Sequence, residues 1–305
     1  RDGRPDDVLL GFDKLEAYEK HGTYIGCAIG RVCSRIAGAS FRLGDQTYSL
    51  PANNGAACHH GGPEGFNRYT WETVDLQRRS VTLRHVSPDL DQGFPGQLTA
   101  EVEYSLLPVA EGTALTIRFR AECNKPTVVN LTNHLYLNLA GHRGSMRETM
   151  CSHRVTIAAD TFAPTDETGI PLGRLDSVEG TPVDFRSPAA IGDRIDDDRL
   201  AAGYDTNMAL RETPGFVPKS RGGTRALGIE LGSDGRWTRS RAPDAIAEEP
   251  TTGRRVEMFT MEPAVHFYTG DYLGNDPKGK GGVDIVKRAG FCFETQHFTD
   301  SPNQP

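Results

Sequence analysis

The sequence has no apolar stretch that approaches the ~20 residues needed to cross a bilayer, and residues 1–7 are too polar and acidic for a secretory signal peptide. It also has no excess of positive charge, since the formal net charge is -7 and the pI is near 5.7. Nucleic acids and anionic membranes both favour basic surfaces. The sequence therefore predicts neither a nucleic-acid partner nor a membrane partner.

Cysteine is sparse, with six residues scattered over 305 and no Cys-x-x-Cys pair. Several of the six lie in apolar, strand-like runs, where free thiols pack as small hydrophobic groups. This usage argues against a disulfide framework and is typical of reduced thiols in a cytoplasmic protein. We therefore expect a cytoplasmic location.

Signatures of cofactors and of covalent catalysis are also missing. The run Cys58-His59-His60 suggests a metal site, but structural zinc sites usually combine two spaced ligand pairs, and no second pair is present. Neither Walker A nor GxGxxG spacing occurs. No Gly-x-Ser-x-Gly elbow marks a serine nucleophile. The sequence predicts no metal and no coenzyme.

Short runs with strand-like alternation recur along the whole chain instead, for example at 81–86, 98–104, 114–119, 155–158, 256–261, 265–269 and 290–295. They are punctuated by 34 Gly and 19 Pro, which favours antiparallel β structure. The clearest helix signal covers 13–22, with Asp13 as N-cap and Glu16 completing a capping box. We predict an all-β fold, a large antiparallel β-sandwich with few short helices, in one domain over 1–305. Residues 213–254, rich in Gly, Pro, Ser and Arg, are expected to form a long irregular excursion.

The most informative run is 127–139. If this run is a strand, its side chains alternate between two faces. One face is mostly apolar. The other face carries hydrogen-bonding side chains, namely Asn130, Thr132, His134, Tyr136 and Asn138. An outer face exposed to water would usually carry Lys or Glu. Neutral polar groups around one histidine suit the wall of a cavity that binds a ligand rich in hydroxyls. A sheet face with a structural histidine is the alternative.

Other candidate groups lie far from this run. Two are Arg35, in a small and apolar segment, and Glu294, at the end of an apolar strand. Histidine titrates near neutral pH, and an ionised carboxylate accepts protons. This pairing suits a reaction that moves protons between two oxygens of one substrate. It is also compatible with a glycosidase that uses the two carboxylates of Asp205 and Glu294.

Taken together, these segments resemble the aldose 1-epimerase (galactose mutarotase) family. The matching pieces occur in the family's order and cover almost the whole chain: 30–36, 53–66 with Trp71, 93–96, 131–141, 160–171, 180–186, 203–207, 267–270 and 290–304. The resemblance implies a two-layered β supersandwich with an open sugar-binding cleft on one sheet. It implies interconversion of the α and β anomers of free hexoses such as galactose and glucose, without metal or coenzyme.

Carried over residue by residue, the resemblance implies that His134 is the general acid and Glu294 the general base. Residues that bind and orient the sugar are then Arg35, His60 and Asp205, together with His266, which stands where the family often has Gln. The family's Asn-His-Leu-His-Gly-Gly reads Ala57-Cys58-His59-His60-Gly61-Gly62 here, so His60 and not His59 is expected in the site. The resemblance also implies additional strands before Arg1 and after Pro305.

Three rival functions remain at this stage. A hexose-6-phosphate 1-epimerase would need basic residues at the rim of the cleft, for which Arg31, Arg68 and Arg143 are candidates. A catalytically inactive sugar-binding module would not need both His134 and Glu294. Glycoside hydrolysis through Asp205 and Glu294 is the third. We expect a monosaccharide as the only partner and a monomer or weak dimer.

Overall fold

The computed structural model describes residues 5–20, 22–110, 112–142, 145–211, 229–231, 237–239, 241–275 and 277–304. Strands dominate these residues, and the two α-helices among them are short, α1 (Leu15–Lys20) and α2 (Met146–Ser152). Neither helix has the length and apolar character to span a bilayer. All ladders between named strands are antiparallel except the one between β17 and β8. The predicted all-β, antiparallel fold class is confirmed.

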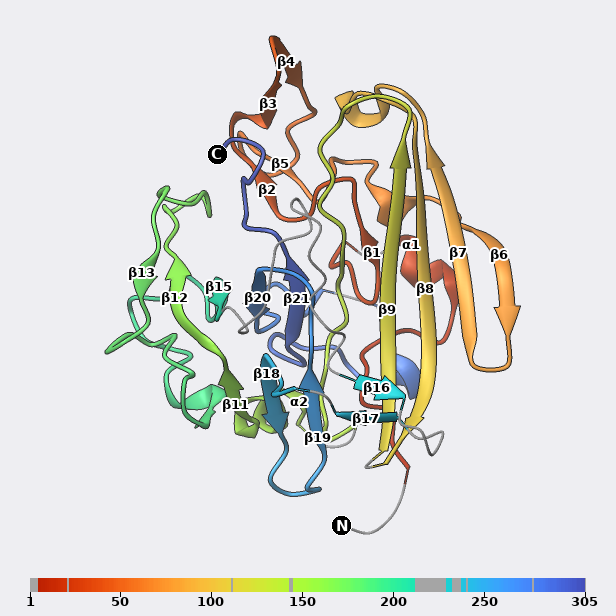
Figure 1. Ribbon diagram of the computed structural model, residues 1–305. Helices are drawn as coiled ribbons and strands as arrows, with labels where there is room; N and C mark the ends of the chain where they lie inside the picture. The colour runs from red at the N-terminus through yellow and green to blue at the C-terminus, as the bar shows by residue number, and fades with distance from the viewer. Residues whose placement is uncertain are drawn as a thin grey trace.

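The largest sheet contains the long strands of the molecule and stands to one side of it (Figure 1). Its order is β16-β17-β8-β7-β6, with β9 also paired to β8: β6 (Glu72–Gln77), β7 (Ser80–Ser87), β8 (Leu98–Val109), β9 (Gly112–Cys123), β16 (Ile229–Leu231) and β17 (Trp237–Arg239). Alternating residues of β8 are buried, and the smallest of them, Ala100, is completely covered. This period is the one that the sequence showed at 98–104.

A five-stranded sheet, which we call the central sheet, extends from β13 at the left of the view to β21 near its middle (Figure 1). Its order is β13-β12-β15-β20-β21: β12 (Ala159–Ala163), β13 (Asp176–Ser177), β15 (Asp205–Leu210), β20 (Ala264–Tyr268) and β21 (Cys292–Gln296). One face is apolar, because Met208, Val265 and Phe267 point into the main hydrophobic core. The opposite face of the same strands carries Asp205, His266 and Glu294, which alternate with the core residues.

Four smaller sheets complete the described structure. The four-stranded one has the order β14-β11-β18-β19: β11 (Arg154–Ile157), β14 (Ala189–Ala190), β18 (Ala245–Glu248) and β19 (Arg255–Met258). Three strand pairs lie in the N-terminal third or reach back to it: β1 (Ala28–Ile29) with β10 (Thr132–Asn133), β2 (Arg35–Ile36) with β5 (Cys58–His59), and β3 (Ser40–Leu43) with β4 (Gln46–Ser49).

The run 127–139 is not one regular strand. Only β10 is paired as a strand, and Leu137 forms isolated bridges with Leu9 and Phe291. Burial nevertheless alternates with a two-residue period along this run. The buried side chains are those of the polar face, Asn130, Thr132, His134, Tyr136 and Asn138. The segment lies between two parts of the chain that supply backbone partners on either side, residues 26–33 and 291–297.

Two sequence predictions need correction. Residues 245–248 belong to the expected excursion, yet they form β18, with Ala245 and Ala247 buried in the main core. Small side chains allow this strand to fit tightly between β11 and β19. Most of the rest of 213–254 lies outside the described residues. Helix α1 is shorter than predicted, and a carboxylate oxygen of Asp13 accepts the backbone N–H of Gly281.

Candidate active site

The central sheet brings three of the predicted residues, Asp205, His266 and Glu294, onto one face. Asn207, His266 and Glu294 are directly opposite one another across β15, β20 and β21. Asp205 is two residues before Asn207 and therefore lies on the same face. Opposed residues on one face of an antiparallel sheet have Cβ atoms about 5 Å apart. The sheet geometry thus places His266 beside Glu294, with Asp205 on the far side of His266.

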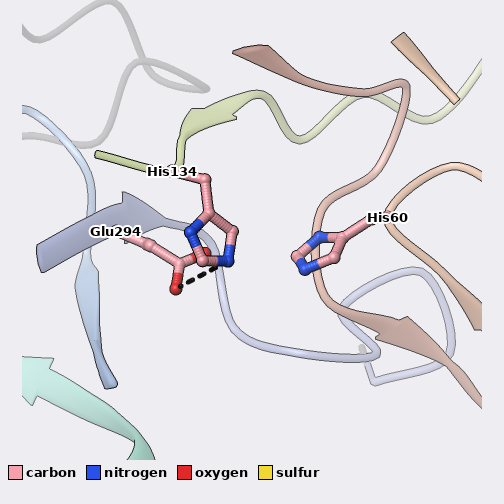
Figure 2. Close-up of side chains that lie close together, drawn as sticks. All are labelled: His60, His134 and Glu294. Carbon is pink, nitrogen blue, oxygen red and sulfur yellow. Dashed lines mark ion pairs between the residues drawn. The ribbon is translucent and has the colours of Figure 1, made fainter. Parts of the chain in front are cut away.

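His134 reaches Glu294 from a different segment. Its backbone N–H donates to the carbonyl of Cys27, and its own carbonyl accepts the N–H of Gly26. On the other side, the hydroxyl of Thr132 donates to the carbonyl of Thr295 next to Glu294. These contacts hold the imidazole Nε2 of His134 3.7 Å from Oε1 of Glu294, with side-chain exposures of only 5% and 3% (Figure 2).

The 3.7 Å separation is too long for a direct hydrogen bond. Imidazole and carboxylate point at a common position without satisfying one another. Burial lowers the pKa of His134, while the negative charge of Glu294 opposes this shift. The arrangement can therefore deliver one proton and remove another at two neighbouring atoms of a bound molecule.

Tyrosine rings enclose the imidazole of His134. The rings of Tyr24 and Tyr136 lie nearly parallel to it, at centroid distances of 5.9 and 4.9 Å, and Tyr268 meets it edge-on at 6.1 Å. The hydroxyl of Tyr136 donates to the carbonyl of Thr23, which fixes that ring. Rings packed in this way restrict the rotation of His134 and keep water away from it.

His60 faces the acid/base pair from the N-terminal part of the chain (Figure 2). It follows β5 in a left-handed backbone conformation with φ +52°. The next residue is Gly61, where a Cβ atom would lie 1.9 Å from the carbonyl oxygen of Gly30, so only glycine fits. The loop is thereby pressed against the backbone at Gly30, and this contact directs the ring of His60 toward His134.

The hydrogen bonding of His60 defines its proton. Its Nδ1 accepts the backbone N–H of Ser34 at 3.1 Å, so the neutral ring carries its hydrogen on Nε2. Burial and the neighbouring His59 hold the pKa of His60 well below its ordinary value. His60 is therefore a neutral donor that offers Nε2–H to the site.

His60, His134 and Glu294 also need to be tested as a metal site, because their ligand atoms lie within 4.8 Å of one another. A histidine that binds a metal through one nitrogen normally donates a hydrogen bond from the other. His60 accepts one there instead, so its Nε2 has no free lone pair. The donor set does not fit a metal ion, and the predicted absence of a metal stays a prediction.

Asp205 and His266 form the tightest polar contact of the site, with Oδ1 and Nε2 2.6 Å apart. Burial disfavours both charges, but the hydrogen bond between them outweighs it. It lowers the pKa of Asp205 to about 2 and raises the pKa of His266, with further help from Glu294. The contact therefore favours the charged form of both partners.

Arg35 supplies a positive charge near Asp205. It lies on β2 directly opposite His59, and its Nε donates to Oδ1 of Asn54 at 3.0 Å. Gly169 packs against the guanidinium so closely that a Cβ there would lie 2.8 Å from Cζ. The positive charge of Arg35 reinforces the low pKa of Asp205.

All six predicted residues therefore converge. His59, which the sequence predicted to lie outside the site, is also next to it, with its ring centroid 3.8 Å from that of His60. The resemblance implies an open cleft, but His60, His134, His266 and Glu294 are almost completely covered. Asp205 and Arg35 keep exposed surface, and the side chain of Asp205 is 30% exposed. The rings around His134 account for the difference. A separate surface hollow, lined by Asp184, residues 186–189 and Arg194, contains none of the six.

Sequence reasoning missed three polar neighbours of the site. Cys292 contacts His134, both side-chain polar atoms of Asn207 are buried without a hydrogen-bond partner, and Nε2 of Gln296 is also unpartnered. Each of these residues stands two positions from a predicted one, either Asp205 or Glu294. The two-residue period of a strand could have found them.

Known proteins of similar sequence identify the family of this chain. The family model described as Aldose 1-epimerase matches residues 1–305. The chain is 39% identical to galactose mutarotase of Bos taurus over 305 residues, which is all of this chain and 79% of that protein. It is 34% identical to aldose 1-epimerase of Escherichia coli (strain K12), covering 80% of that protein. A crystal structure of an aldose epimerase homologue from C. elegans superposes with a TM-score of 0.81 at 26% identity, covering 99% of this chain and 82% of that one. The chain belongs to the aldose 1-epimerase family.

Proposed function

We propose that the protein is an aldose 1-epimerase, an isomerase that interconverts the α and β anomers of free hexoses such as galactose and glucose. One observation carries the proposal: a buried imidazole and a buried carboxylate face the same position 3.7 Å apart in a chain that matches this family over its whole length. Both are side chains of this protein, and the reaction needs no electron or group carrier.

In the proposed mechanism, Glu294 removes the proton of the anomeric hydroxyl while His134 gives a proton to the ring oxygen. The ring opens to the aldehyde, and rotation about the C1–C2 bond exposes its other face. Closure then runs with the roles of the two residues reversed. Acid and base act together on two oxygens of one carbon, so neither oxygen develops a full charge, and each group contributes typically ~10²–10⁴-fold.

The remaining four residues hold the sugar in this scheme. His60 offers the Nε2–H donor, and Asp205 offers a carboxylate acceptor that its bond to His266 keeps ionised. Arg35 provides forked donors, which suit vicinal hydroxyls. Arg35 and the imidazole of His266, whose charged form the bond to Asp205 favours, oppose two carboxylates, so the site favours a neutral ligand over an anionic one.

The charge balance and the position of Arg31 both weaken the hexose-6-phosphate alternative. Arg31 is buried, and its guanidinium donates to Ser87 and to the carbonyls of Phe94, Pro95 and Pro88. It is therefore committed to the fold. Arg68 is exposed and donates to the carbonyl of Glu19, and Arg143 lies outside the described residues.

Glycoside hydrolysis needs a carboxylic acid that is protonated near neutral pH. The pKa of Asp205, about 2, does not suit that role, and the carboxylate of Glu294 faces the imidazole of His134. An inactive sugar-binding module would have no use for an acid and a base aimed at one position. Both alternatives are weaker than anomer interconversion.

Polarimetry of freshly dissolved α-D-galactose and α-D-glucose tests the proposal. We expect the wild type to accelerate mutarotation strongly and His134→Ala to abolish the acceleration nearly completely. Cleavage of a nitrophenyl glycoside would favour hydrolysis, and action restricted to glucose 6-phosphate would favour the phosphate-specific epimerase. Sugar binding without acceleration would favour the inactive module.

We also propose a cytoplasmic location, supported by six free cysteines, of which Cys33, Cys58 and Cys292 are buried. The monomer or weak dimer expected from the sequence stays a prediction, which sedimentation velocity would test.

A further inference from the structure

His59 lies beside the site, and the proposed mechanism gives it no role. It is directly opposite Arg35 across the pair of β2 and β5, so the two side chains lie on one face of this pair. The other face is apolar, because Ile36 and Cys58 are buried in a hydrophobic cluster. The side chains of His59 and Arg35 therefore point away from that cluster.

The neighbours of His59 fix its backbone and its ring. The side-chain amide of Asn53 accepts the backbone N–H of His59 at 2.7 Å and donates to its carbonyl at 3.0 Å. The imidazole packs against the ring of His60, with centroids 3.8 Å apart, and meets the ring of Tyr24 edge-on at 5.9 Å. His59 and Asp205 are also close enough for each to shift the pKa of the other. The imidazole of His59 thus faces the site.

The polar atoms of this ring are available to a ligand. Within the described part of the chain, the hydrogen bonds of His59 involve its backbone, and neither ring nitrogen has a partner. The residue is partly exposed, as are Arg35 and Asp205, whereas the acid/base pair is almost completely covered. His59, Arg35 and Asp205 therefore form the accessible rim of the site.

The charge of His59 sets what it can bind. Burial and the positive charge of Arg35 lower the pKa of His59 to about 3, although Asp205 opposes this shift. A neutral imidazole offers one N–H donor and one lone pair. Arg35 can only donate and an ionised Asp205 can only accept, whereas a sugar hydroxyl does both. Of the three rim residues, His59 is the one that can either donate to a hydroxyl or accept from it.

We propose that His59 is a further sugar-binding residue, whose imidazole forms a hydrogen bond with one hydroxyl of the hexose other than the anomeric hydroxyl. The proposal rests on the proposed function, in which Glu294 and His134 take the anomeric hydroxyl and the ring oxygen. The hydroxyls left for the rim residues are those on the other carbons. Hexoses differ from one another in the orientation of these hydroxyls. The contact therefore contributes to affinity and to the choice among hexoses, and not to proton transfer.

A purely structural role, in which the ring of His59 only supports that of His60, is the alternative. His59→Leu keeps an apolar side chain of similar size against His60 and removes both ring nitrogens. We expect it to raise KM for galactose by about three- to tenfold, the effect of one lost neutral hydrogen bond. The loss should fall on KM rather than on kcat. His59→Gln, whose amide still donates and accepts, should recover most of the affinity. A fall in kcat at unchanged KM in His59→Leu would make His59 a support for His60 and overturn the proposal.

A panel of monodeoxy galactoses, each lacking a single hydroxyl, identifies the group that His59 binds. Removing both partners of one hydrogen bond costs no more than removing either of them. The derivative that lacks the bound hydroxyl should therefore have the same KM with the wild type and with His59→Leu. The other derivatives should keep the difference seen with galactose. A constant ratio of KM values across the whole panel would contradict a contact with one hydroxyl.

His85→Leu is the matched control. The ring of His85 also packs against aromatic rings, those of Tyr69 and Trp71. The charged groups that act on it are Asp91 and Arg31, and neither belongs to the site. The same chemical change at His85 should leave KM for galactose within about twofold of the wild type. An equal rise of KM in both variants would show that the effect of His59→Leu is not local.

Equilibrium titration with galactose, followed by NMR, separates this proposal from the proposed function. The dissociation constant should rise in His59→Leu by the same factor as KM. A wild type that binds galactose without accelerating mutarotation would end the proposed function, and the titration would still decide the contact of His59. A wild type that accelerates mutarotation and a variant of unchanged affinity would end only the contact. A wild type that binds none of these sugars would overturn both.

Discussion

The substitution Asp205→Asn probes the charged pair at the edge of the site. It keeps the shape of the side chain and removes the charge that faces Nε2 of His266 at 2.6 Å. We expect three consequences: a loss of folding stability, a fall in the pKa of His266 and a higher KM for galactose. All three follow from the same contact.

The stability loss can be worked out from the pKa of Asp205. A carboxyl group that titrates at about 2 in the folded protein, against an ordinary value of 3.8, stabilises the fold by about 2 kcal/mol near neutral pH. Because the folded-state pKa is depressed, this contribution is fully present above pH 3.8 and is lost as the pH falls toward 2. The variant should therefore be less stable than the wild type at pH 6, and the difference should shrink in acid.

The pKa of His266 should move in the opposite sense to its present shift. Burial disfavours the imidazolium, and Asp205 is the main group that opposes this effect. In Asp205→Asn the pKa of His266 should fall below that of the wild type. Urea denaturation between pH 2 and pH 6 and NMR titration of His266 measure the two quantities.

Asp160→Asn is a suitable control. Asp160 also lies on a strand and binds Arg211 at 2.6 Å, but both side chains are about half exposed. Exposed ion pairs typically contribute about 0–1 kcal/mol, so this variant should lose little stability. If Asp205→Asn were as stable as Asp160→Asn at pH 6, with the pKa of His266 unchanged, the account of the pair would be refuted.

Three further predictions concern other parts of the site. The double variant His134→Ala with Glu294→Gln should be about as active in mutarotation as the slower of the two single variants, because the effects of two residues that act as a unit do not add. Additive losses of activity in polarimetry would contradict a concerted acid and base. Arg31→Met should lower the free energy of unfolding by about 3 kcal/mol or more, since several carbonyls lose a charged donor, yet leave KM for galactose near that of the wild type; a large rise in KM would place Arg31 in the site. His60→Gln should retain more of kcat/KM than His60→Ala, because its amide still offers an N–H; equal losses would argue against His60 as a donor.

Strand periodicity was the most informative signal in the sequence. It predicted the two faces of 127–139, and the burial of His134 and Tyr136 follows that alternation. The same period applied to β21 would have found Cys292 beside Glu294. Local patterns of this kind reflect side-chain direction, which the backbone fixes within two residues.

Contacts between distant segments were not accessible to this reasoning. Nothing local indicates that His134 will lie next to Glu294, and that pairing came from the family resemblance. Strand β18 was missed for a related reason. Its residues Ala245–Glu248 have weak strand propensity, and they form a strand because β11 and β19 supply partners on both sides.

The central claim is that His134 and Glu294 act on the two oxygens attached to one carbon of a pyranose. A crystal structure of Glu294→Gln soaked with galactose tests this most directly. The account predicts the anomeric oxygen within hydrogen-bonding distance of residue 294 and the ring oxygen facing Nε2 of His134. A sugar bound with C1 away from both side chains would contradict it.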